Sequence, residues 1–175
     1  MKQTKISVLL ASLMAAGFML SGQAMAAEAS ANIDATVLTP IAITKNENLN
    51  FGQLLAGTSA GTVVLEATLE AARSASGGVS LPASNSGTVT AAKFTITGQV
   101  GSTYTITLPE SAVELDGPSA ATMSVDTFTS SIVSPATIVE GGSALYVGAT
   151  LNVGVNQAAG TYSAVSGLPV IVNYN

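Results

Sequence analysis

Short runs of alternating apolar and polar residues follow one another along most of the chain. From Ala31 onward, Gly, Pro, Asn and Ser separate these runs. A period of two places successive side chains on opposite faces of an extended chain, so each run is typical of a strand with one buried face. About eight to ten such runs predict an all-β fold, an immunoglobulin-like antiparallel β-sandwich of two packed sheets.

The two clearest runs are AAKFTITG and STYTITLP, joined by a short link that contains glycine. Phe94 and Ile96 alternate with threonine in the first run, and Tyr104, Ile106 and Leu108 do so in the second. Two alternating runs across such a link predict a β-hairpin.

Other runs predict a long strand and two local irregularities. The alternation from 145 to 155 indicates one continuous strand. Phe128 breaks the alternation of the preceding run, which predicts a bulge or bend near Asp126. Phe51 stands directly before Gly52 and is expected to be a core aromatic residue beside a turn.

The stretch from 64 to 76 is ambiguous. Leu65, Leu69 and Ala72 recur at helical spacing, whereas TVVLEAT is rich in β-branched residues. We favour a strand followed by a loop, because a lone helix would need its own apolar groove in an all-β chain. The following SASGGVSLPASNSG is expected to be a Ser/Gly-rich loop.

The first 26 residues have the pattern of a secretory signal peptide. Lys2 and Lys5 precede an apolar run from 6 to 20, and the small-residue motif AMA ends at Ala26. The apolar run is short for a transmembrane helix, so we expect cleavage and a single β-sandwich domain over 27–175. The chain is therefore expected in the periplasm, and then at the cell surface or outside the cell.

Charge and composition exclude several function classes. Beyond residue 26 the only basic side chains are those of Lys45, Arg73 and Lys93, beside ten acidic ones. So few cations disfavour nucleic acid and anionic lipid as partners. The chain has no cysteine, so its fold must rest on packing and backbone hydrogen bonds without disulfides.

The residues offer little for catalysis or metal binding. Histidine and cysteine, the commonest general base and thiolate, are absent. The candidate carboxylates for acid–base chemistry or calcium are Glu66, Glu70, Glu110, Glu114, Asp116 and Asp126. Their spacing lacks the density of a calcium loop and is more typical of a solvated sheet face. We expect no enzyme activity, no cofactor and no metal site.

Four stretches together resemble a family of secreted bacterial β-proteins. They are LNFGQLLAG, AAKFTITGQVGSTYTITLP, LYVGATLNVGVNQAAGTYS and the final VIVNYN. This combination, spread from about Ala31 to Asn175, resembles domain of unknown function 4402. More distantly, the early FG, the late GTY and the final strand are similar to spore-coat-U subunits of archaic chaperone–usher pili.

The pilin resemblance implies a function without catalytic residues. In such pilins the immunoglobulin-like domain lacks a strand, which a periplasmic chaperone and then the next subunit's N-terminal extension supply. Carried over here, residues 27–44 hold the donor, with Ile33, Ala35 and Val37 filling pockets. The acceptor groove would be flanked by the C-terminal assembly strand, which comprises Leu168, Val170, Val172 and Tyr174.

The expected partners are other copies of the chain or related subunits, with a periplasmic chaperone and an outer-membrane usher. The chain would thus be a structural subunit of a fimbria or surface fibre. Two features depart from the pilin pattern: the absence of a disulfide, and Pro169 at the start of the final strand. The alternative is a self-complete secreted sandwich that binds a glycan or a surface protein through its loops.

Overall fold

The computed structural model describes residues 27–175, so the predicted signal peptide lies outside the described residues. The chain divides into two units, with a boundary between Thr36 and Val37. The described part of the first unit, residues 27–36, contains no helix or strand, and its side chains are exposed. The second unit, Val37–Asn175, contains ten strands, which confirms the predicted all-β fold.

The ten strands form two antiparallel sheets. They are β1 (Ala42–Glu47), β2 (Leu55–Leu65), β3 (Arg73–Ser80), β4 (Ala92–Thr97), β5 (Thr103–Thr107), β6 (Val113–Asp116), β7 (Thr122–Ser130), β8 (Ala136–Thr137), β9 (Ser143–Val153) and β10 (Ile171–Tyr174). A single 3₁₀ turn, Pro118–Ala120, joins β6 to β7.

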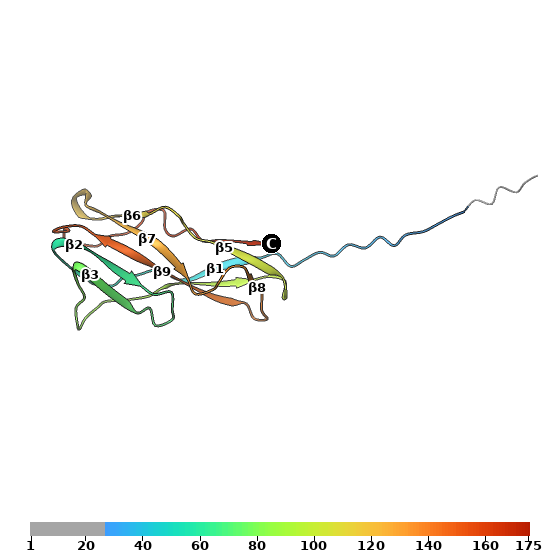
Figure 1. Ribbon diagram of the computed structural model, residues 1–175, viewed down its shortest axis with the longest axis horizontal. Helices are drawn as coiled ribbons and strands as arrows, with labels where there is room; N and C mark the ends of the chain where they lie inside the picture. The colour runs from blue at the N-terminus through green and yellow to red at the C-terminus, as the bar shows by residue number, and fades with distance from the viewer. Residues whose placement is uncertain (1–26) are drawn as a thin grey trace, which may run out of the picture. The chain divides into compact units, whose positions relative to one another are not determined.

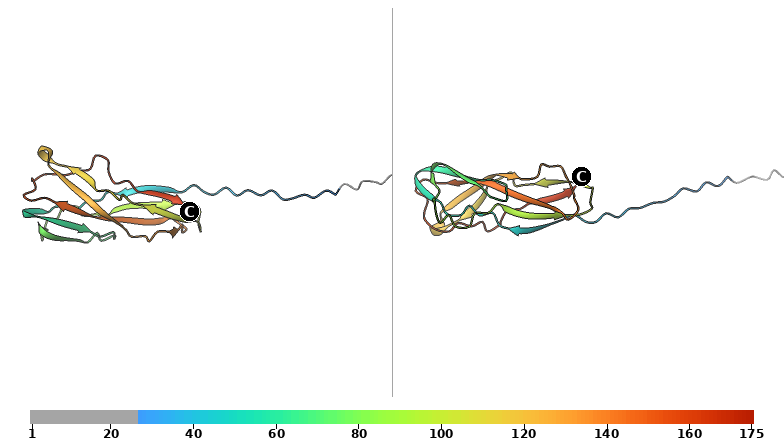
Figure 2. Two further views of the ribbon diagram at one scale, coloured as in Figure 1. Left: turned by 45° about the horizontal axis from the view of Figure 1, so that its top comes forward. Right: turned by 90° about the horizontal axis from the view of Figure 1, so that it is seen from below.

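The larger sheet has seven strands. Its main order is β1-β4-β9-β2-β3, and β7 also pairs with β9 and carries β6. The smaller sheet has the order β10-β5-β8. Within the second unit, β2, β3 and β6 lie at one end, and β1, β5 and β8 lie at the other (Figure 1). Two views from other sides show the strands of this sandwich running along its length (Figure 2).

Strand β9 connects two hydrophobic cores. Its first half pairs with β4 and its second half pairs with β2. Its inward residues are almost completely buried, namely Leu145, Val147, Ala149, Leu151 and Val153. Leu145 and Val147 belong to one of these cores, and Ala149, Leu151 and Val153 belong to the other. The alternation that predicted a single long strand is thus confirmed.

We call the core beneath β2, β3 and β7 the first core, and the core between β4, β9 and the small sheet the second core. The first contains Phe51, Val63, Leu65, Val79, Met123, Val125, Leu151 and Val153. The second contains Phe94, Ile96, Tyr104, Ile138, Leu145, Val147 and Val172. Each core buries alternate residues of its strands, as period-two patterning requires.

The predicted hairpin between AAKFTITG and STYTITLP is wrong. Both runs are strands, but β4 pairs with β1 and β9, whereas β5 pairs with β10 and β8. Residues 98–102 therefore carry the chain from one sheet to the other. The buried residues of the two strands, including Phe94, Ile96 and Tyr104, face each other across the second core.

The stretch from 64 to 80 was predicted in part. The strand preference is confirmed, because β2 continues to Leu65 and a loop follows it. The predicted Ser/Gly-rich loop is wrong over its first half, since Arg73–Ser80 forms strand β3. That strand pairs only with β2 and lies at the edge of the sheet, where small exposed side chains suffice.

Two local predictions are confirmed. The pairing of β7 with β9 shifts register between Asp126 and Thr129, and Thr127 has a positive φ of 50°. Phe51 is 8% exposed in the first core, and Gly52 has a φ of 68° at the turn that follows it.

A tyrosine fixes the chain before the last strand. Tyr162 donates a hydrogen bond from its hydroxyl to the carbonyl oxygen of Ala158, at 2.8 Å, and accepts one from the Gln157 amide at 2.9 Å. A tyrosine whose hydroxyl bonds back to the chain a few residues upstream, just before the last strands, is a feature of immunoglobulin-like sandwiches.

Candidate interaction groove

One wall of a groove is formed by the chain that follows β1. The backbone of Asn50 exchanges two hydrogen bonds with the backbone of Thr90, at 2.8 and 3.0 Å. The backbone N–H of Gln53 donates to the carbonyl oxygen of Ser86 at 2.7 Å. These bonds all run toward one side, the side on which β1 pairs with β4. Within residues 27–175, no strand pairs with the opposite edge of β1. This edge has backbone groups available for pairing.

Arg73 and Gly52 hold this wall in place. The Arg73 guanidinium donates hydrogen bonds to the carbonyl oxygens of Phe51 and Gln53, the latter at 2.7 Å, on either side of Gly52. The wall thus bends around one guanidinium group, and its Phe51 side chain is buried in the first core. Gly52 takes the left-handed conformation that the bend requires.

The opposite wall is formed by residues 157–169. It is anchored near its middle, where Ser163 and Asp116 exchange two backbone hydrogen bonds of 2.9 and 3.0 Å. Further along, the chain becomes β10, in which Ile171 opposes Thr107 of β5.

Two prolines interrupt the pairing between those two points. When the register of β10 and β5 is continued, Pro169 falls opposite Pro109. Neither proline has an N–H to donate, so the ladder cannot continue through this position. The edge of β10 away from β5 has no paired strand in the described part of the chain.

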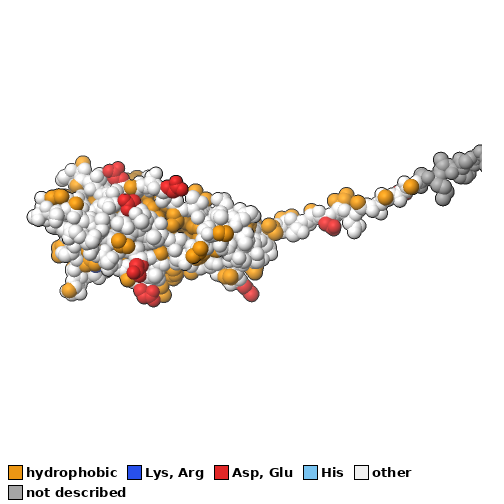
Figure 3. Space-filling model, viewed as in Figure 1, with side chains coloured by type: hydrophobic (Ala, Val, Ile, Leu, Met, Phe, Trp, Pro, Cys, Tyr) orange, Lys and Arg blue, Asp and Glu red, His pale blue; other side chains and the backbone are white. Residues whose placement is uncertain are grey.

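Between the walls lies an open cavity of about 1040 Å³. Its floor is apolar and includes Phe94, Leu115, Met123, Val125, Phe128 and Leu151. These residues come from both cores and from four strands of the larger sheet. On the face shown in Figure 3, hydrophobic side chains gather in the middle of the sandwich, and acidic side chains lie around them.

Two charged residues, Lys45 and Glu47, also line the cavity. Lys45 opposes the buried Phe94 in the pairing of β1 with β4, so its side chain leaves the strand toward the inner face, and it donates to the Asn48 amide oxygen at 2.8 Å. Glu47 lies 3.9 Å from the ammonium of Lys93. An inward-pointing charge on an open edge discourages indiscriminate pairing with other chains.

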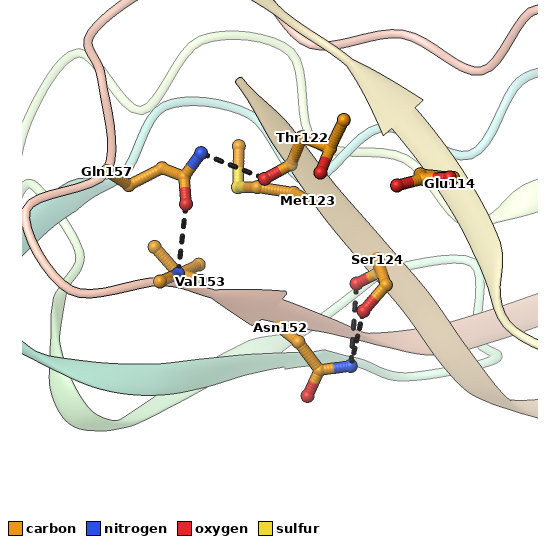
Figure 4. A pocket seen from close by; sticks show the side chains of 8 residues that line it. Glu114, Thr122, Met123, Ser124, Asn152, Val153 and Gln157 are labelled. Carbon is orange, nitrogen blue, oxygen red and sulfur yellow. Dashed lines mark hydrogen bonds between the residues drawn. The ribbon is translucent and has the colours of Figure 1, made fainter. Parts of the chain in front are cut away.

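A second, shallower depression of about 360 Å³ lies beside β7 and β9. Figure 4 shows that its polar side chains already serve the fold. The Gln157 side chain donates to the Thr122 carbonyl and accepts from the Gly154 amide, both at 3.0 Å, and Asn152 donates to the Ser124 hydroxyl at 3.3 Å. These amides brace the turn after β9 against β7.

The candidate carboxylates do not form a metal-binding cluster within residues 27–175. Glu114 and Asp116 lie on β6, Asp126 lies on β7, and Glu66 and Glu70 lie in the loop between β2 and β3. Asp126 accepts a hydrogen bond from Asn152 at 2.8 Å, across the pairing of β7 with β9. These five carboxylates are thus spread over β6, β7 and the loop between β2 and β3.

The predicted donor residues lie outside the strands. Ile33 is 96% exposed and Val37 is 94% exposed, and Ala35 is also exposed. No helix or strand is formed between residues 27 and 41.

The four residues of the predicted C-terminal assembly strand have different surroundings. Leu168 lines the groove, and Val172 is buried in the second core with Val170 packed against it. Tyr174 also packs against that core, and its hydroxyl hydrogen-bonds to the backbone of Thr39 and Gln99. The strand itself is shorter than the predicted run and begins at Ile171.

The wall formed by the chain that follows β1 was not predicted from the sequence. Its only signal was the Phe51–Gly52 pair, which marked a core residue and a turn but not a groove edge. The role of Arg73 had no signal, because its carbonyl partners lie about twenty positions away.

Residues 41–174 match the family described as Domain of unknown function (DUF4402). The chain belongs to the DUF4402 family. The match begins just before β1 and ends in β10, so the DUF4402 domain contains both walls of the groove, and residues 27–40 lie outside it. Comparisons with curated proteins and with solved structures find no match. Among residues 27–175 of this DUF4402 protein, no helix is long and apolar enough to cross a membrane.

Proposed function

We propose that this protein is a structural subunit of a fimbria or surface fibre, and that subunits join by β-strand addition. The observation that carries the proposal is the open apolar groove, whose walls continue from β1 and into β10, two strands that each have one edge without a partner strand among the described residues. Strand addition needs such edges for main-chain hydrogen bonds, and it needs pockets beneath them for alternate side chains.

The occupant we propose is the segment 27–38 of a second copy. Its odd-numbered residues from 27 to 37 are all apolar, namely three alanines followed by Ile33, Ala35 and Val37. Its even-numbered residues from 28 to 36 are all polar. As an extended strand, the stretch from 27 to 37 spans about 33 Å and presents one apolar face.

Burial of this face supplies the free energy of association. Ile33 and Val37 are almost fully exposed in the single chain. Burying two side chains of this kind contributes about 3–6 kcal/mol before the cost of ordering the segment is subtracted. The alanines add less area, and the backbone ladder fixes the register.

The proposal also places the protein along an export route. The predicted signal peptide would bring the chain to the periplasm, where a chaperone would cover the groove until an usher delivers the subunit. An exposed apolar groove between open edges is an aggregation hazard without such a cover.

The test compares assembly of the processed chain with that of an Ile33→Asp/Val37→Asp variant. We expect the first to form oligomer ladders that survive mild denaturant and the second to remain monomeric, because two charges cannot enter the apolar groove. Thr36→Asp, which adds a charge on the polar face, is the matched control and should assemble. Monomers of the unaltered chain under all conditions, with and without any co-encoded chaperone, would refute the proposal.

A further inference from the structure

Tyr174 ties the last strand to the chain that precedes β1. Its hydroxyl donates a hydrogen bond to the carbonyl oxygen of Thr39 at 2.7 Å and accepts one from the amide of Gln99 at 2.6 Å. The Gln99 side-chain oxygen also lies 3.4 Å from the Thr39 amide nitrogen and 3.3 Å from the Thr39 hydroxyl. Thr39 is therefore held through both backbone groups and its side chain.

The fit around this hydroxyl is close. A Cβ atom added at Gly98 would collide with the Tyr174 hydroxyl and would lie 3.3 Å from the Cα of Ile41. The absence of a side chain at position 98 is thus required for the contact. We call Tyr174, Gln99 and Gly98 the Thr39 clamp.

The clamp acts at the residue where a reversal of the chain would have to occur. For segment 27–38 to enter the groove of its own molecule beside β1, the chain would have to turn between Leu38 and Ile41. The commonest such turn, type I, needs helical backbone at both of its central residues, here Thr39 and Pro40. Pro40 disfavours helical backbone at Thr39, and the hydrogen bonds that Tyr174 and Gln99 make with the Thr39 backbone would have to break before that backbone could rotate.

A barrier to self-insertion matters because a subunit's own segment, which is tethered to the groove, has a large kinetic and thermodynamic advantage over the segment of another subunit. A segment joined by a short linker has an effective concentration in the millimolar range. Subunits at micromolar concentration would face a competition of about a thousandfold from their own segments. Without a barrier, closed monomers would dominate.

We infer that the Thr39 clamp favours insertion of segment 27–38 into a second copy over insertion into its own groove. The clamp opposes rotation of the Thr39 backbone, so a turn at this junction is disfavoured and the segment remains available to a neighbour. This inference rests on the proposed function and concerns the choice between self and partner.

Two variants open the clamp in different ways. Tyr174→Phe removes both hydrogen bonds of the hydroxyl, and Gly98→Ala displaces the hydroxyl without changing Tyr174. Hydrogen exchange on Asn32–Val37 is measured in the monomer fraction, together with oligomer ladders. We expect unprotected amides and ladders in the unaltered chain, and protected amides with a loss of ladders in both variants. Tyr146→Phe is the control. It removes the hydroxyl of a tyrosine on β9 that is not part of the clamp, and it should behave like the unaltered chain.

A peptide-binding experiment distinguishes the clamp inference from the proposed function. A peptide of residues 27–38 is added to the Ile33→Asp/Val37→Asp chain, whose own segment cannot compete. Binding of the peptide supports the groove as an acceptor; if both clamp variants then keep unprotected segments and form normal ladders, the clamp inference alone is overturned. Failure of the peptide to bind would overturn the proposed function and the clamp inference with it.

Discussion

The hydroxyl of Tyr104 is buried without a hydrogen-bond partner among the described residues. Tyr104 is 0% exposed in the second core. A buried polar group that lacks a partner costs about 1–3 kcal/mol. Tyr104→Phe should therefore raise the free energy of unfolding by about 1 kcal/mol, as measured by urea denaturation. Tyr146→Phe, at a half-buried position, should leave it nearly unchanged, and a destabilised Tyr104→Phe would contradict this account.

Gly52 is required by both backbone conformation and space. An added Cβ would collide with the Ser86 carbonyl oxygen and would lie 2.7 Å from a methyl carbon of Val89, at a φ of 68°. Gly52→Ala should lower the free energy of unfolding by about 1–3 kcal/mol. Gly101→Ala is the control, because Gly101 also has a positive φ but has no atoms within 4 Å of the added Cβ. Equal losses of unfolding free energy at the two sites would show that the close contacts around Gly52 contribute nothing.

At the residue scale, sequence reasoning worked where a side chain follows a local pattern. Phe51 was predicted to lie in the core because an aromatic residue stands before a glycine turn. Arg73 was not predicted to hold the wall, because its hydrogen bonds depend on how β2 and β3 bring position 73 beside positions 51 and 53.

At the scale of elements, β9 contributes buried side chains to both hydrophobic cores. Leu151 is 2% exposed and lies on the part of β9 that β2 and β7 flank. Leu151→Ala should cost about 2–5 kcal/mol through lost burial and the cavity left behind. Leu69→Ala, at a position 66% exposed, is the matched control and should cost little. Denaturant midpoints of both variants check the difference.

The sequence predicted strands better than it predicted their partners. Alternation identifies a strand with a buried face, and it did so for β4, β5 and β9. It cannot say whether a short link turns the chain within a sheet or carries it across to the other, which is why the hairpin was wrong. Strand β3 was read as a loop because an edge position tolerates Ser and Gly, the residues that also mark loops.

At the scale of the whole molecule, an occupied groove should stabilise the sandwich. A ligand that binds only the folded state adds about 2.7 kcal/mol at a concentration one hundred times its Kd. The peptide of residues 27–38 should therefore raise the unfolding midpoint of the Ile33→Asp/Val37→Asp chain in a concentration-dependent way. A peptide with the same residues in scrambled order should not. An unchanged midpoint at saturating peptide would contradict occupation of the groove.

The groove itself was not predictable from the sequence at this level of detail. Its walls, 48–54 and 157–169, contain no regular strand, and only tertiary structure brings them to opposite sides of an apolar floor. The proposed occupant, the alternating segment before β1, and the final apolar run that was predicted to flank the groove were both visible as sequence patterns. The interruption at Pro109 and Pro169 became apparent only from the register of β10 with β5.

Strand β9 has a mechanical consequence for any fibre built from this protein. It runs through both cores, and its neighbours pair with it in antiparallel ladders whose hydrogen bonds lie across the strand direction. Tension applied along the strands would act on many of these bonds at once instead of opening them one after another. A filament of such subunits would resist stretching without covalent cross-links, because many ladder hydrogen bonds would bear the shear force together.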